Sequence, residues 1–111
     1  MLALTNSQVA EESAKDAEIQ MAMKWIDKNE KWPQEILKYQ AFRGDLFVQG
    51  QFLMKREKTV LPLGLRQRAL QLAHKSHPGM SAMKNFLRQG LWWPSIGREV
   101  EVYVRVSPNA N

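Results

Sequence analysis

The sequence predicts an α+β protein, with N-terminal helices and a three-stranded antiparallel meander followed by a three-helix bundle. Three observations predict this class. Apolar residues recur at helical intervals near both ends of the chain, β-prone runs lie between them, and Gly or Pro stands where the pattern changes. The 111 residues, 44% of them hydrophobic, are enough for one compact domain or for two very small ones that share a core.

The N-terminal part of the chain has the signals of short helices. Thr5 and Gln8 have the spacing of a capping box, and Asp16 is a second candidate N-cap. Apolar residues at helical intervals then predict an amphipathic helix over residues 16–29. Pro33 suits the first turn of one further short helix.

After residue 44 the period of the pattern changes. Two β-prone runs flank Gln49-Gly50, and a charged turn over Lys55–Lys58 leads to a third run over residues 59–61. These runs predict the three-stranded meander. Pro62 lacks a backbone N–H and is expected to end the ladder.

The rest of the chain is predicted to be helical. One helix is expected over residues 63–74, a second around Met83, and a third after Pro94. Helices this short cannot each bury an apolar face alone, so we expect them to pack as a bundle. The chain therefore divides into residues 1–61 and residues 62–111.

Charge is unevenly distributed between the two halves. Residues 1–54 hold 6 Lys/Arg against 8 Asp/Glu, a net charge of −2, whereas residues 55–111 hold 10 against 3, a net charge of +7. A basic half indicates a polyanionic partner, most simply nucleic acid. The alternative is a solvated basic surface without a specific partner.

A set of motifs follows at fixed spacing: His74-x-x-His77-Pro78-Gly79, Met83-Lys84 and Trp92-Trp93-Pro94. Together they closely resemble the histidine-and-cysteine zinc domain at the front of integrases from gypsy-type LTR retrotransposons. Upstream, Trp32-Pro33 and Arg43-Gly44-Asp45-Leu46 look like the extension that precedes this domain in those integrases. The resemblance covers nearly the whole chain.

The resemblance implies a three-helix bundle of integrase zinc-domain type, helix-turn-helix-like, with zinc on two histidines and two cysteines. Here the two cysteine positions fall on Ser107 and Ala110, and the chain contains no cysteine. A closed zinc site needs four ligands, and neither side chain replaces a thiolate. We therefore expect no cofactor. His74 and His77 could hold a metal only loosely, or they are ordinary residues at a helix end.

Basic and amide side chains on the predicted helices are the candidates for contacts with DNA. They are Arg66, Arg68, Lys75, Lys84, Asn85, Arg88 and Arg98. The helix after Pro78-Gly79 is the best candidate for a recognition helix, although a solvated face would have the same sequence. Trp92 and Trp93 could stack on bases, but we expect at least one in the core.

No catalytic motif is visible, and we interpret the chain as a non-enzyme. The resemblance implies that the catalytic carboxylates belong to a separate core domain, beyond residue 111. Two functions remain: a non-catalytic nucleic-acid-binding fragment, or a protein-interaction or homo-oligomerisation scaffold with no DNA role. A relic without a selected role is a third possibility. No apolar run could span a bilayer, so we expect no membrane partner and a nuclear or cytoplasmic location.

Overall fold

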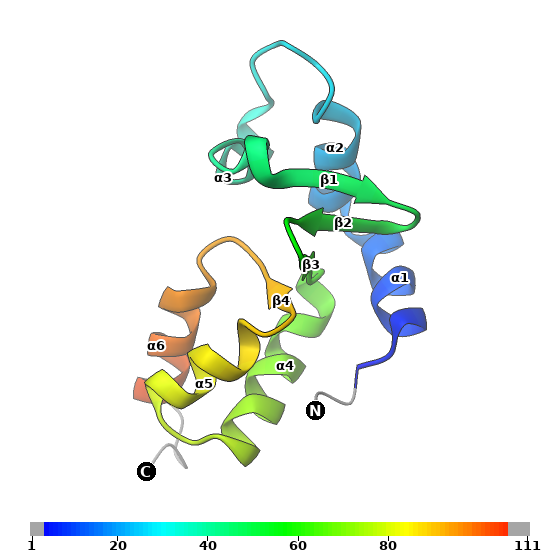
Figure 1. The fold of residues 1–111 in the computed structure, drawn as a ribbon. Helices are drawn as coiled ribbons and strands as arrows, with labels where there is room; N and C mark the ends of the chain where they lie inside the picture. The colour runs from blue at the N-terminus through cyan, green and yellow to red at the C-terminus, as the bar shows by residue number, and fades with distance from the viewer. Residues whose placement is uncertain (1–3, 107–111) are drawn as a thin grey trace.

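The computed structural model describes residues 4–106 and has an α+β fold, as predicted (Figure 1). The elements, in order, are α1 (Asn6–Lys15), α2 (Ala17–Trp25), η1 (Gln34–Ile36), α3 (Leu37–Gln40), η2 (Arg43–Asp45), β1 (Leu46–Gln49), β2 (Phe52–Lys55), β3 (Lys58–Val60), α4 (Leu63–Ser76), α5 (Met80–Leu87), β4 (Leu91–Trp92) and α6 (Ile96–Val106). The helices α4, α5 and α6 lie at one end, and α2, α3 and the β1–β2 hairpin lie at the other. No helix in residues 4–106 has the length and hydropathy needed to cross a membrane.

The two predicted N-caps are confirmed. In the capping box, the Gln8 backbone N–H donates to Thr5 Oγ1 (3.1 Å), and the Thr5 N–H donates to Gln8 Oε1 (2.9 Å). Asp16 ends α1 and caps α2, where its Oδ1 accepts from the N–H of Ile19 (3.1 Å). The second helix is shorter than predicted and ends at Trp25. The chain leaves the helix there through a tighter turn, in which the Lys28 N–H donates to the Trp25 carbonyl (3.0 Å).

The sheet differs from the prediction because it has four strands, in the order β1-β2-β3-β4. The first three pair antiparallel in sequence order, and β4 adds to β3 in parallel, with Thr59 opposite Leu91 and Val60 opposite Trp92. No sequence pattern predicts β4. Two residues cannot show a period, and their partner strand lies about thirty positions earlier in the chain.

The protein has two apolar cores, which meet where β4 pairs with β3. One collects buried residues of α4, α5 and α6, together with Val9 of α1, Leu61 and Trp93. The other collects residues of α2, α3 and the sheet, including Tyr39, together with Trp92. Successive residues of a strand point to opposite faces, so Trp92 and Trp93 enter different cores. Each core therefore draws residues from both sides of the predicted boundary at 61/62.

Candidate nucleic-acid interface and histidine pair

The two histidines lie at the C-terminal end of α4, where aromatic side chains of the neighbouring helices hold them. The ring of His74 packs edge-on against Tyr103 of α6, with centroids 5.5 Å apart. The ring of His77 stacks on Phe86 of α5 at 4.3 Å. His74 Nε2 and His77 Nδ1 are buried and have no hydrogen-bond partner among residues 4–106. Each imidazole thus has a buried nitrogen without a partner in the described part of the chain.

These unpaired nitrogens provide only half of a zinc site. Within the described part of the chain, no group of three or more His, Cys, Asp or Glu side chains is placed to hold a metal ion. The predicted third and fourth positions, Ser107 and Ala110, lie outside the described residues, and neither side chain is a thiolate. The residues present therefore do not fit a closed four-ligand zinc site.

Arg66 does not lie on the surface, in contrast to the predicted basic face. Its side chain is in the interior, where the residue is only 7% exposed. Arg66 Nε donates to the Leu61 carbonyl (2.9 Å), Nη2 donates to the Tyr39 hydroxyl (3.0 Å), and the guanidinium lies over the ring of Trp93. Its planar fork of donors thus joins α4 to α3. Arg66 is therefore not available to a phosphate group.

Lys84 is on α5 but is already engaged with α6. Its Nζ donates to Glu101 Oε2 at 2.8 Å, and its side chain is 21% exposed. This hydrogen bond, followed by the positive charge of Lys84, lowers the pKa of the Glu101 carboxyl. The neighbouring Glu99 accepts a hydrogen bond from Trp93 Nε1 (3.0 Å). Two of the three acids in the basic half thus have internal partners.

The other predicted DNA-contacting residues are exposed, and they are Arg68, Lys75, Asn85, Arg88 and Arg98. They come from three helices. Arg68 and Lys75 are seven residues apart, so they share one face of α4. Asn85 lies on the exposed side of α5, Arg88 is the C-cap of that helix, and Arg98 lies in the first turn of α6. None of the cations among them forms an ion pair with a carboxylate within residues 4–106.

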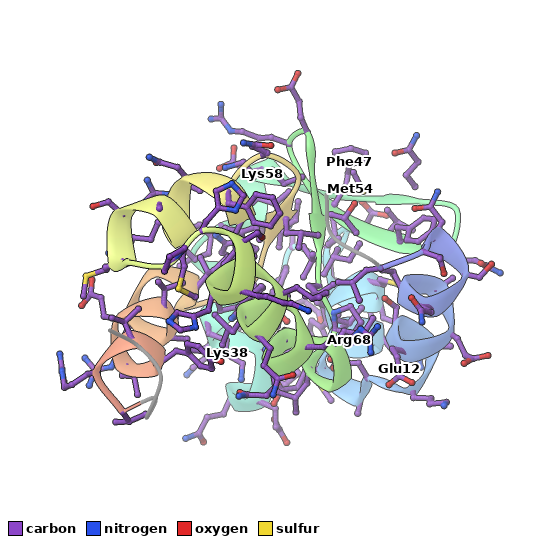
Figure 2. The ribbon with its side chains drawn as sticks, turned by 90° about the horizontal axis from the view of Figure 1, so that it is seen from below. Glu12, Lys38, Phe47, Met54, Lys58 and Arg68 are labelled. Carbon is purple, nitrogen blue, oxygen red and sulfur yellow. The ribbon has the colours of Figure 1, made fainter. Side chains whose placement is uncertain are left out.

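Two more lysines, Lys55 and Lys58, flank the β2–β3 turn. The sequence pattern indicates them only as part of a charged turn, not as candidates for contacts with DNA. Lys55 Nζ lies 5.3 Å from the ring centre of Phe42 and 5.0 Å from that of Trp92. Lys58 begins β3 beside the chain that leaves α5, because the Thr59 N–H donates to the Gly90 carbonyl (3.0 Å). Figure 2 shows Lys58 well apart from Arg68. Lys58 and Arg68 therefore do not belong to one basic patch.

Comparison with known proteins assigns the helical half to a class. Residues 61–108 match the family described as "Integrase zinc binding domain". The uncharacterized protein K02A2.6 of Caenorhabditis elegans is 27% identical over 107 residues, which make up 92% of this chain and 8% of that protein. No solved structure gives a significant match.

The protein is thus a small α+β module whose helical half is similar to an integrase zinc-binding domain. Both matches support an integrase-type N-terminal region. The family match covers the zinc-binding domain and no catalytic core.

Proposed function

We propose that the chain is a non-catalytic nucleic-acid-binding module derived from the N-terminal region of a gypsy-type LTR retrotransposon integrase. The observation that supports this function is the unbalanced positive charge on the surface of the α4–α6 half. Glu99 accepts a hydrogen bond from Trp93, and Glu101 forms an ion pair with Lys84. The exposed cations on three helices have no carboxylate partner among the described residues.

Such a surface binds the phosphate backbone. Each Lys or Arg that neutralises a phosphate releases condensed counterions, so the affinity falls steeply as salt rises. Contacts with phosphate position a protein without reading sequence, and we expect little sequence preference. Asn85 on the exposed side of α5 and Arg88 at its C-cap are the side chains that could reach base edges.

The structure indicates which basic residues should be mutated to test DNA binding by this surface. Replacing Lys84 would release Glu101 and alter the contact between α5 and α6, so its effect on binding would be ambiguous. Arg88 and Arg98 are exposed and have no such partner among residues 4–106. The double variant Arg88→Ala with Arg98→Ala therefore removes two cations while leaving the described contacts intact.

We expect this double variant to bind a random-sequence DNA duplex more weakly in fluorescence anisotropy titrations. Its slope of log K against log salt should be shallower by about 0.9 for each lost phosphate contact. The matched control is Lys24→Ala with Lys31→Ala, which removes two exposed cations from the acidic half. Absence of salt-dependent binding by the parent, or an equal loss in the control, would contradict the proposal.

The second candidate function, an interaction or homo-oligomerisation scaffold, is favoured by a different surface. Strand β1 is the outer strand of the sheet and has two exposed apolar residues.

A further inference from the structure

The outer edge of β1 has backbone groups that find no partner in the described part of the chain. The N–H of Arg56 donates to the Asp45 carbonyl (2.8 Å), so the backbone of Asp45 faces β2. Backbone N–H and C=O groups alternate in direction along a strand. Those of Phe47 and Gln49 therefore also point toward β2, whereas those of Leu46 and Val48 point away from the sheet. The Leu46 N–H is used within η2, where it donates to Arg43. The Leu46 carbonyl and both backbone groups of Val48 have no partner among residues 4–106.

The two central side chains of this strand are apolar and exposed. Phe47 is 43% exposed and Val48 is 45% exposed, and they lie on opposite faces of the sheet. Their cross-strand neighbours, Met54 and Leu53, are also apolar, and Figure 2 shows Phe47 beside Met54. The strand contains no charged residue and no proline, the two features that usually prevent an edge from pairing with another strand.

We propose that β1 pairs antiparallel with β1 of a second copy of this chain, about a two-fold axis through Val48. In this register the two Val48 residues exchange both of their backbone hydrogen bonds. The Leu46 carbonyl then lies opposite Gly50 of the other copy, whose N–H also points outward. The pairing joins the two four-stranded sheets into one continuous sheet.

The second copy is favoured over a foreign strand because this register is self-complementary. It satisfies all three open groups of Leu46 and Val48, whereas a two-fold axis through Phe47 would leave the Val48 carbonyl without a partner. Charge is also compatible. Asp45 lies opposite Gln51 of the other copy, so a carboxylate faces an amide and no two like charges are directly opposed. An isologous contact of this kind closes as a dimer.

A charge-swap experiment tests whether the two-fold axis of the dimer passes through Val48. Val48→Lys and Val48→Glu each place two like charges directly opposite in the self-pair, whereas a mixture of the two variants places a lysine opposite a glutamate. By sedimentation equilibrium without nucleic acid, we expect the parent to dimerise with rising concentration. Each variant alone should dimerise at least tenfold more weakly, and the equimolar mixture should recover the dimer. Circular dichroism checks that both variants fold.

The matched control is Val102→Lys, which changes another exposed valine, 40% accessible, on α6. It should dimerise like the parent. A second variant tests the register directly. The parent contains no cysteine, so Val48→Cys introduces a single thiol that should form a disulfide-linked dimer on mild oxidation. Gln67→Cys, exposed on α4, should cross-link far more slowly.

A parent that stays monomeric at the highest soluble concentration would overturn the proposal. So would equal dimerisation of Val48→Lys and Val102→Lys, or equal cross-linking of the two cysteine variants. Because these measurements contain no DNA, they test self-pairing independently of the nucleic-acid function. The arginine variants of α5 and α6 leave β1 unchanged, so either proposal can fail alone.

Discussion

Asp16 caps α2 and also bonds to Leu63 at the start of α4, 47 residues later in the sequence, so its removal should weaken both helix starts. Oδ1 accepts from the Ile19 N–H at the start of α2 (3.1 Å), and Oδ2 accepts from the Leu63 N–H at the start of α4 (2.9 Å). A negative charge also interacts favourably with the N-terminus of each helix. A single carboxylate thus ties the N-terminal helices to the helical half.

The magnitude follows from these two contacts. Loss of an N-cap costs about 1 kcal/mol. The second, charge-assisted hydrogen bond is exposed to solvent and contributes about 1.5 kcal/mol, the low end of its range. Asp16→Ala should therefore reduce the free energy of unfolding by about 2.5 kcal/mol and lower the Tm by about 10 °C for a chain of this size. Asp16→Asn keeps one acceptor oxygen and should lose about half as much.

Urea denaturation followed by circular dichroism measures this change. The matched control is Asp27→Ala, an exposed aspartate after α2 whose effect should stay within about 0.5 kcal/mol. If Asp16→Ala is no more destabilising than the control, the bond between Asp16 and Leu63 does not hold the two parts together, and the reasoning is refuted.

Three further predictions concern the core and the metal. Chelating agents should leave the far-UV circular dichroism and Tm unchanged, whereas Ser107→Cys with Ala110→Cys should give tight zinc binding by calorimetric titration; helix loss on chelation would contradict the first. Trp93→Ala should cost about 3–5 kcal/mol in urea, because the side chain is fully buried; a loss below 1 kcal/mol would contradict its core role. Burial raises the pKa of Tyr39 above its ordinary 10.0, so the folded state keeps the phenol proton to higher pH than the unfolded state does. The free energy of unfolding should therefore fall as pH rises above 10. Tyr39→Phe should remove the contribution of Tyr39 to this fall, as measured by urea denaturation at several pH values.

The sequence by itself determined the local features of this protein. The capping box at Thr5 and the cap that Asp16 provides to α2 depend on contacts within about one turn of helix, and a short stretch of sequence contains them. The same holds for the charge division and for the histidine motif without its cysteines, which are properties of composition and spacing.

Tertiary structure alone decided which side chains are free to act. Arg66 and Arg68 are both arginines of α4, yet one is buried against Tyr39 and the other faces solvent. Lys84 is engaged because Glu101 of α6 lies beside it. The β4 strand and the open edge of β1 depend on pairings between distant segments. Local periodicity contains no information about such contacts, because they form only when the chain brings those segments together.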